Sequence, residues 1–474
     1  MKFGGTSVGD APCIARVARI VKDAAHEGPI VVVVSAMSGV TNKLIKAAKF
    51  SEAGDTDHTD AVFADLRKQH EVALGALIRD DAKRSHLAAG LEKFFNEGVT
   101  LCKGTALLHE LTARTLDAVS SLGERLSAPM VAGALSELGM HAEAVEATEL
   151  IVTDSYHGGA DPVMDLTRVR SQERLRKSLE RGAIPVVTGF IGSTRDGVLT
   201  TLGRGGSDYS ATILGAALDA DEVIIWTDVN GVLTADPRLV PDARTIPEIS
   251  YREATELAYF GAKVLHPKTL RAVSQAGIPV WIRNSFAPEQ TGTKITPKGR
   301  SNGGGVKALT AISDVALIAV GGPGIVGLPD VVGRTFSTTA DVHASVLLIS
   351  QSSSQNDICL IVAASDAKRT VDALRKEFAQ DVAHEKVEHI TVDPNIAIVA
   401  VIGENMRGSP GVAGRTFNAV GRESVNIIAI AQGSSETNIS FVVSEKDMKV
   451  ALAAVHSEFE LGVRRSREAE VKVS

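Results

Sequence analysis

The pattern of apolar and polar positions divides the chain up to Ser285 into alternating strands and helices. Continuous apolar runs at 29–34, 184–188 and 222–226 are typical of strands buried on both faces, as in parallel sheets. The segment 43–140 carries mixed charges and few strand formers, which predicts that this region is mostly helical. The segment 207–218 predicts another helix between two of the strands. This alternation predicts α/β layering up to about Ser285.

A change in composition and an internal repeat mark a second region of the chain. Residues 286–305 are rich in loop formers, and we place the main domain boundary there. Beyond it, Val331–Phe336 aligns with Val412–Phe417 and Ile349–Ser354 aligns with Ile430–Ser435, both at the same offset and without a gap. Each copy predicts the order strand, helix, strand, strand, helix, with a further strand from a flanking segment, which is a ferredoxin-like fold. Two copies suggest paired regulatory modules, and the alternative is a structural pair that binds no ligand.

Charge and cysteine content narrow the class of protein. The net charge is −7, from 57 acidic and 50 basic residues, so no basic field would collect the phosphates of a nucleic acid. The cysteines Cys13, Cys102 and Cys359 are far apart and show neither a disulfide framework nor a zinc spacing, which fits a reducing cytoplasm. No apolar stretch reaches the ~18 residues of a membrane span. We therefore expect a cytoplasmic protein that binds neither nucleic acid nor membrane.

Glycine-rich segments are the first candidates for chemistry. No Walker-type phosphate loop is present in the sequence, so any phosphate must be held by other glycine loops. Lys2–Val8 predicts a short strand, a glycine turn and then a helix, which is the layout of an anion cradle. In Thr200–Ser210, glycines surround Arg204, whose guanidinium can bind an anion through two hydrogen bonds. Asp208 begins the next helix, and its alternative interpretation is a first-turn acid stabilised by the helix dipole.

Two later segments carry weaker signals for a nucleotide. Trp226–Val232 follows a buried strand, and its polar residues could hold a base or ribose, although a plain turn explains Asn230 and Gly231 equally well. Lys263 could reach a phosphate, but by itself a solvated surface lysine is the better interpretation. Neither segment identifies a nucleotide site on its own.

Taken together and in order, the motifs resemble those of the aspartate kinase family. They are K-F-G-G-T-S-V, V-V-V-S-A-M-S-G-V-T-N, G-E-R-L-S, T-L-G-R-G-G-S-D-Y-S-A, W-T-D-V-N-G-V and F-G-A-K-V-L-H-P. The repeated modules resemble the paired ACT domains of the same family. The resemblance implies an amino-acid-kinase fold, an open and largely parallel sheet with helices on both faces, followed by two ferredoxin-like βαββαβ ACT domains. We expect the catalytic domain at 1–300 and the ACT domains at 306–386 and 387–474, with room for strand exchange between the two.

The resemblance also implies an activity and its site. The family phosphorylates the side-chain carboxylate of L-aspartate with MgATP, giving 4-phospho-L-aspartate, the first step toward lysine, threonine and methionine. The residues implied are Lys2 and Asp208 for catalysis; Ser35, Thr41, Glu124, Arg204 and Ser207 for aspartate; and Lys2, Gly4, Gly5, Thr227, Asp228, Arg238 and Lys263 for ATP. Mg²⁺ would bind with the ATP phosphates, and no protein ligand is assigned to it.

The chemistry of the reactants fits these roles. Because the aspartate carboxylate is already ionised at pH 7, no general base is needed. The obstacle is its repulsion from the triphosphate, which Lys2, Lys263 and Mg²⁺ would offset while positioning supplies the rest. Glu124 and Arg204 together would recognise a zwitterionic amino acid.

The ACT domains imply feedback control by a pathway amino acid. In threonine-sensitive relatives a glutamine in each module contacts the effector, and Gln351 and Gln432 stand at those positions one repeat apart. Leu347 stands where some lysine-sensitive relatives place an acid, so we expect threonine rather than lysine. Pairing of ACT domains between chains implies a homodimer or a dimer of dimers, and the chain length implies a monofunctional kinase. The alternatives are an ACT-based amino-acid sensor without kinase activity and another amino-acid kinase.

Overall fold

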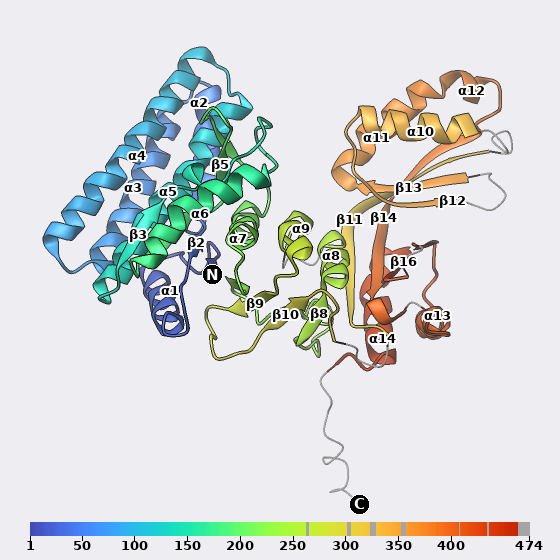
Figure 1. The fold of residues 1–474 in the computed structure, drawn as a ribbon. Coiled ribbons are helices and arrows are strands. Elements are labelled where there is room, and N and C mark those ends of the chain that lie inside the picture. Colours follow the sequence, from blue (N-terminus) through green and yellow to red (C-terminus); the bar gives the residue numbers. More distant parts are fainter. Residues whose placement is uncertain are drawn as a thin grey trace, which may run out of the picture. The chain divides into compact units, whose positions relative to one another are not determined.

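The computed structural model describes residues 1–261, 265–300, 305–322, 329–351, 357–406, 408–433 and 436–462. The chain forms two compact units (Figure 1). The first comprises 1–232, 247–251 and 264–299, and the second comprises 233–246, 252–263 and 300–474. Two segments that precede Phe286 in the sequence therefore belong to the same unit as the C-terminal repeat. Within the described residues, no helix is long and apolar enough to cross a membrane.

The first unit is built on an eight-stranded sheet in the order β3-β4-β2-β1-β7-β9-β10-β8. The strands are β1 (Lys2–Phe3), β2 (Val32–Val34), β3 (Ala142–Val145), β4 (Ile184–Thr188), β7 (Val223–Thr227), β8 (Glu248–Ser250), β9 (Val280–Asn284) and β10 (Thr293–Thr296). Neighbouring strands are parallel except for the antiparallel pair β9 and β10. A separate antiparallel hairpin joins β5 (Ile191–Ser193) to β6 (Leu199–Thr201).

Helices cover both faces of this sheet. They are α1 (Ala11–Ala24), α2 (Val40–Glu52), α3 (Thr56–Leu77), α4 (Asp81–Leu108), α5 (Ala113–Glu137), α6 (Met164–Glu180), α7 (Gly206–Ala217) and α9 (Pro267–Ala276), with a 3₁₀ turn at η1 (Ala147–Glu149). Alternate strand residues such as Phe3, Val32 and Val34 share a core with α1 and α5. Helices α6 and α7 pack against the opposite face, since they contact strands of the sheet but contribute nothing to that core. The prediction of a largely parallel α/β fold is confirmed.

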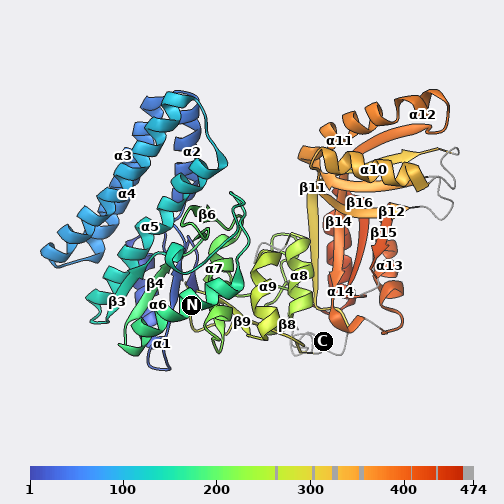
Figure 2. The same cartoon turned by 45° about the horizontal axis from the view of Figure 1, so that its top comes forward.

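The region between 43 and 140 is mostly helical, as the sequence predicts. Helices α2 to α5 contact one another, and α3 lies beside α4 (Figure 2). Helix α5 then returns to the sheet and packs on β3 and β4. The long helical segment between β2 and β3 therefore ends with α5, which contacts both the other helices of the segment and the strands of the sheet.

The second unit holds a six-stranded antiparallel sheet in the order β12-β13-β11-β14-β16-β15. The strands are β11 (Ala308–Gly321), β12 (Val346–Gln351), β13 (Asp357–Ala363), β14 (His389–Ile402), β15 (Ala429–Gln432) and β16 (Asn438–Ser444). The helices are α8 (Tyr251–Tyr259), nearly all of which lies in this unit, α10 (Pro329–Asp341), α11 (Ala364–Glu377), α12 (Ala379–Ala383), α13 (Val412–Arg422) and α14 (Met448–Glu458), with 3₁₀ turns at η3 (Glu404–Met406) and η4 (Glu445–Asp447).

The repeat offset is preserved in three dimensions. The start of β11 and the start of β14, at Ala308 and His389, are exactly one repeat apart, and so are the starts of β13 and β16, at Asp357 and Asn438. Each module places two helices against its strands, so both copies have the βαββαβ order of the predicted ferredoxin-like fold. The prediction of two such modules is confirmed.

The two central strands are shared between the modules. Strand β11 pairs with β14 along its whole length, from Ala308 with Ile402 to Gly321 with His389. Leu309, at the start of β11, is buried in the core of the second module, whereas Ile390, at the start of β14, is buried in the core of the first. The first half of β11 thus completes the second module, and the first half of β14 completes the first module.

Candidate active site

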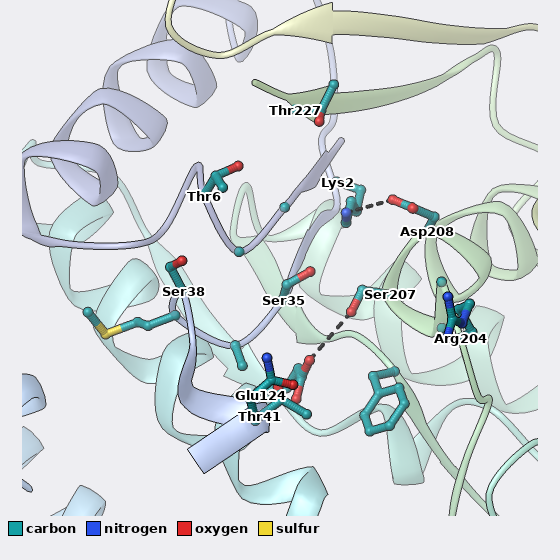
Figure 3. Close-up of a pocket in the computed structure, with 18 of the residues that line it drawn as sticks. Lys2, Thr6, Ser35, Ser38, Thr41, Glu124, Arg204, Ser207, Asp208 and Thr227 are labelled. Carbon is teal, nitrogen blue, oxygen red and sulfur yellow. Dashed lines mark hydrogen bonds and ion pairs between the residues drawn. The ribbon is translucent and has the colours of Figure 1, made fainter. Parts of the chain in front are cut away.

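A pocket opens at the carboxyl ends of four neighbouring parallel strands of the first unit, β4, β2, β1 and β7. Its cavity volume is about 540 Å³, within the range of small-molecule sites. The lining residues that the sequence predicted are Lys2, Gly4, Gly5, Ser35, Thr41, Glu124, Arg204, Ser207, Asp208, Thr227 and Asp228. Figure 3 shows the labelled side chains of this group arranged around one space. Open α/β sheets bind ligands at this edge because the chain turns to opposite sides there.

Two helices begin at the pocket without a side-chain cap. Helix α2 starts from Gly39 at φ 80° and helix α7 from Gly205 at φ 69°, and both glycines line the cavity. The first backbone N–H groups of a helix have no partner within it, and side chains cap several other helices of this unit, for example Asp10 at α1. Because no side chain caps α2 and α7, backbone N–H groups at their first turns are available to a ligand in the pocket. The positive end of each helix dipole also faces the pocket, and both features favour the binding of an anion.

Lys2 supplies a cation inside the pocket. Its side chain is 8% exposed, and its Nζ lies 2.6 Å from Asp208 Oδ1 in the first turn of α7 (Figure 3). Because β1 alternates its side chains, Phe3 packs into the core with α1 while Lys2 faces α7. A Cβ at Gly4 would lie 3.4 Å from the Lys2 ammonium, so glycine leaves room for it. Lys2 is therefore fixed in place by its strand and by one carboxylate.

Glu124 is a buried carboxylate with unused hydrogen-bonding capacity. It is 3% exposed, and its Oε1 accepts a long 3.5 Å hydrogen bond from Ser207 Oγ (Figure 3). Its Oε2 is buried and has no hydrogen-bond partner. Burial raises the pKa of Glu124 to about 8, against the smaller lowering effect of neighbouring N–H groups, Ser207 and Lys2. A buried acid of this kind would be stabilised by a ligand that brings a cation.

Glycines allow Glu124 and Arg204 to reach the pocket. A Cβ at Gly123 would come within 2.6 Å of the Ala36 side chain, so glycine lets α5 approach the loop after β2 closely. Gly203 and Gly205, at φ 78° and 69°, flank Arg204 in the turn that immediately precedes α7. Arg204 is exposed, in contrast to Glu124, and so is free to swing onto a ligand.

Some predicted site residues lie elsewhere. Arg238 belongs to the second unit, where its guanidinium lies 2.6 Å from Asp236, and it is absent from the pocket lining. Lys263 lies outside the described residues. Gln351 and Gln432 are exposed at the ends of β12 and β15, and these edge strands meet where Ser350 Oγ lies 3.5 Å from the Ile430 carbonyl oxygen. Within the described residues, no cluster of three or more metal-binding side chains occurs.

The pocket also contains residues that were not predicted as site residues. Thr6 and Ser38 line it from loops and Asn42 lines it from the first turn of α2, and each lies next to predicted residues, so their motifs gave a signal that could have included them. Phe190 lines it at φ 70°, a conformation that a bulky side chain rarely adopts. Its backbone N–H donates to Ser210 Oγ over 2.9 Å, which helps to hold it there. No sequence pattern indicates such a strained residue.

Comparison with known proteins places the chain in a family. Residues 1–284 match the model of the amino acid kinase family, and residues 318–378 and 399–459 each match that of an ACT domain. The two ACT matches are one repeat apart, in agreement with the structure.

Three similar proteins show how far the likeness extends. The bifunctional aspartokinase/homoserine dehydrogenase of Daucus carota is 37% identical over 97% of this chain, but the chain spans only 50% of that protein. Aspartokinase 1 of Arabidopsis thaliana is 31% identical over 97% of this chain and 79% of its own length. The structure of E. coli aspartokinase III with aspartate and ADP has a TM-score of 0.80 at 31% identity, covering 96% of this chain and 98% of that one. The chain belongs to the aspartate kinase family, with an amino acid kinase domain followed by two ACT domains.

Proposed function

We propose that the chain transfers the γ-phosphoryl group of ATP to the side-chain carboxylate of L-aspartate. The observation that carries the proposal is the buried Glu124 carboxylate with an unpartnered oxygen, in one pocket with the exposed Arg204. An anion and a cation placed this way fit the ammonium and the carboxylate of an amino acid. The same pocket holds Lys2 and two uncapped helix starts, which suit phosphates. The similar E. coli enzyme is described with aspartate and ADP.

In this proposal each side chain orients or neutralises, and none removes a proton. Glu124 and Ser207 hold the ammonium of aspartate, Arg204 holds its backbone carboxylate, and Ser35 and Thr41 contact the substrate from the neighbouring loops. Lys2 and the N–H groups of α2 and α7 stabilise the charge on the transferring phosphoryl group. Asp208 orients the Lys2 ammonium through the 2.6 Å ion pair.

The nucleotide is proposed to lie beside Lys2, over the carboxyl end of β7. Gly4 and Gly5 would let its phosphates approach the backbone, and Thr227 and Asp228 would contact the rest of it. Roles for Arg238 and Lys263 at the phosphates remain part of the proposal. The donor set fits Mg²⁺, since Asp208 and Asp228 add one or two carboxylates to the phosphate oxygens that this ion prefers. Held there, Mg²⁺ would supply positive charge that offsets part of the negative charge of the triphosphate.

A coupled assay for ADP release tests the activity. We expect MgATP consumption that depends on L-aspartate, and no dependence on aspartate would refute the proposed function. Arg204→Ala should raise the KM for aspartate about a hundredfold while changing the KM for ATP little, because a charged hydrogen-bonding partner is lost from one substrate only. Equal effects on both substrates would remove Arg204 from the aspartate clamp.

The pH dependence of aspartate binding tests Glu124 separately. In the empty pocket its pKa is about 8, so it is mostly protonated at pH 7. Because the ammonium of aspartate requires the ionised form, kcat/KM for aspartate should rise as the pH increases through about 8. Glu124→Gln should lower kcat/KM at every pH and abolish this rise. A wild-type profile that is flat between pH 6.5 and 9 would contradict the assignment.

We propose threonine as the feedback effector, bound near Gln351 in the first module. The support is the pair of glutamines at the ends of β12 and β15 and the absence of an acid at Leu347. The alternative is lysine, because the E. coli aspartokinase III structure of similar fold is described with lysine and aspartate. Inhibition assays with threonine, lysine and methionine decide between them, and inhibition by lysine alone would refute the assignment to threonine.

The remaining expectations concern assembly, boundaries and location. We propose a homodimer or a dimer of dimers formed through the ACT domains, which sedimentation or light scattering would test. The boundaries 1–300, 306–386 and 387–474 are kept as the functional division. A reducing compartment such as the cytoplasm is proposed on the free thiols of Cys13, Cys102 and Cys359, although several relatives are named as chloroplastic.

A further inference from the structure

A buried carboxylate outside the pocket ties together the segments next to Arg204. Asp117 lies in the first turns of α5 and is 2% exposed. We infer that it is a positioning residue that sets the place of the Arg204 loop, and thereby the specificity for aspartate. The inference rests on the proposed function, in which Arg204 holds the aspartate carboxylate.

Asp117 accepts hydrogen bonds from two segments that are distant in sequence. On one side, the backbone N–H of Gly158 lies 3.1 Å from both of its carboxylate oxygens, and His157 Nδ1 lies 2.8 Å from Oδ2. On the other side, Thr201 donates from its hydroxyl over 2.5 Å and from its backbone N–H over 3.3 Å. One carboxylate therefore clamps the 154–161 loop to the end of β6.

The 154–161 loop and the end of β6 both lie next to the turn that holds Arg204. The backbone N–H of Ala160 donates to the carbonyl of Thr201 over 2.9 Å, which adds a direct bond between them. Gly203 packs against the same loop, where an added Cβ would lie 3.0 Å from the Gly158 carbonyl oxygen. Only Leu202 and Gly203 separate the clamped Thr201 from Arg204. A displacement of Thr201 or of the 154–161 loop would therefore move the guanidinium.

The same helix presents both ends of the proposed aspartate site. Asp117 and Glu124 are seven positions apart on α5, about two helical turns, so they lie on one face. Glu124 meets the ammonium directly, and Asp117 positions the residue that meets the carboxylate. The rigid helix thus fixes the distance between the two recognition groups, which is what distinguishes an α-amino acid from a simple carboxylic acid.

The two acceptor oxygens of a carboxylate can serve all of the groups that face Asp117 at once. The groups that face Asp117 are the N–H groups of Gly158 and Thr201, the Thr201 hydroxyl and the His157 ring. An asparagine would turn one acceptor oxygen into an NH₂ donor, which would face another donor in a buried site. Asp117→Asn therefore changes the hydrogen bonding with almost no change in volume.

The test is a double-mutant cycle between Asp117 and Arg204. In the coupled ADP-release assay, Asp117→Asn should raise the KM for aspartate about tenfold and leave the KM for ATP within about twofold. In an Arg204→Ala background the same substitution should add no further rise, because its effect acts through Arg204. Aspartate dissociation constants from calorimetry provide the same cycle for variants that turn over too slowly. Asp60→Asn is the matched control, since Asp60 is an exposed aspartate on α3, outside both the pocket lining and the 154–161 loop.

The outcomes separate the inference from the proposed function. Equal rises in both KM values, a fall in kcat alone, or full additivity with Arg204→Ala would overturn the positioning role. If Asp117→Asn does not fold, as judged by circular dichroism, Thr201→Val replaces it, because it removes one donor and leaves the carboxylate. We expect a smaller rise, about threefold, in the KM for aspartate, and an unchanged value would overturn the inference. A wild-type enzyme without aspartate-dependent turnover would instead refute the proposed function.

Discussion

The two ACT modules have the same internal contacts but differ in the other segments of the chain that pack against them. In the first, Arg334 lies 2.7 Å from Glu377 and over the ring of Phe378. The second repeats this with Arg415, Glu458 and Phe459, each one repeat further along the chain. Strand positions and helix order also coincide. The duplicated fold has thus kept its internal contacts in both copies.

The second module is the one joined to earlier parts of the chain. Its core takes in Ala235 and Val240 from the 233–246 segment, and His456 Nε2 lies 3.0 Å from Thr234 Oγ1. Among the described residues, the core of the first module is formed by residues between 316 and 390. One contact of this module with α8 is the Tyr259 hydroxyl, which donates to the Val346 carbonyl oxygen over 3.3 Å.

From this difference we expect the two modules to have different roles, with the first responding to a ligand and the second held to the rest of the unit. A module whose core includes a segment of another part of the chain cannot change shape without moving that segment. A module attached through an edge strand has more freedom to respond to a ligand. Substitutions at matched positions of the two modules test this difference.

The buried ion pair between Lys307 and Glu253 should show the largest effect. Lys307 Nζ lies 2.7 Å from Glu253 Oε2, and the side chains are 2% and 0% exposed. Lys307→Met would leave the carboxylate buried without its cation, so the free energy of unfolding should fall by about 3–5 kcal/mol. Urea titration followed by circular dichroism measures it.

One repeat further, the position equivalent to Lys307 is the exposed Glu388, which serves as the control. Glu388→Gln should change the stability by less than about 0.5 kcal/mol. The double variant Lys307→Met, Glu253→Gln should recover most of the loss, because it removes both charges and keeps an acceptor oxygen for the Glu404 backbone N–H. If Lys307→Met and Glu388→Gln lower the free energy of unfolding equally, the proposal that the two modules are attached differently is refuted.

The glutamines at the ends of the edge strands should respond unequally. We expect Gln351→Ala to raise the threonine concentration for half-inhibition about tenfold, within the usual range of an allosteric coupling energy. Gln432→Ala, in the anchored module, should raise it less than about threefold. The measurement is the dose–response of the coupled assay at fixed aspartate. A larger effect of Gln432→Ala would reverse the proposed division.

His456 should make the second module sensitive to acid. Burial lowers its pKa, while Asp242 raises it and Arg244 lowers it further. Between the lowered pKa and 6.5, the unfolded state binds a proton that the folded state does not, so stability should fall as the pH drops below 6.5.

His456→Gln tests this directly. At pH 8 it should cost about 1 kcal/mol through the weakened bond to Thr234, and it should remove the acid-dependent part of the loss. The equivalent position in the first module is Arg375, so no histidine stands there. Thermal unfolding between pH 5 and 8 compares the wild type with His456→Gln, and a pH dependence that the substitution leaves unchanged would show that His456 is not its source.

The repeated arginines should show the smallest and most equal effects. Arg334 and Arg415 are 33% and 50% exposed, so solvent screens their ion pairs. Including the contact with the ring, each substitution to alanine should cost about 0.5–1 kcal/mol. Unfolding in low and high salt measures the costs, and a difference above about 1 kcal/mol between them would contradict the common scaffold.

Much of the fold was predictable because its signals are local or periodic. The apolar runs at 29–34 and 184–188 identify buried strands, and the constant offset between the repeated motifs identifies the duplication. The resemblance allowed for an exchange of strands between the two modules, but the sequence did not identify β11 and β14 as the strands involved, because each half-strand has the same alternating pattern wherever it pairs. Nor did it show that 233–246 belongs to the second unit, since membership depends on tertiary packing of residues such as Val240.

The candidate site was predictable where polar motifs follow strands. Gly4, Ser35 and Thr227 come at the carboxyl ends of β1, β2 and β7, which parallel pairing brings together. Arg238 follows the same kind of motif but belongs to the second unit and is absent from the pocket lining, so its predicted role stays a prediction. Phe190 and Asp117 gave no signal, because their roles depend on a strained backbone and on contacts with distant loops.

The shared strands have a consequence for dissecting the protein. A cut between the modules near Val387 would leave Leu309 without the core that buries it and would remove Ile390 from the core that it completes. Neither fragment would then be a whole module, and each would expose an apolar strand edge that invites aggregation. Chimeras that exchange one regulatory module for that of a relative must therefore move β11, β14 and both sets of helices as a single piece.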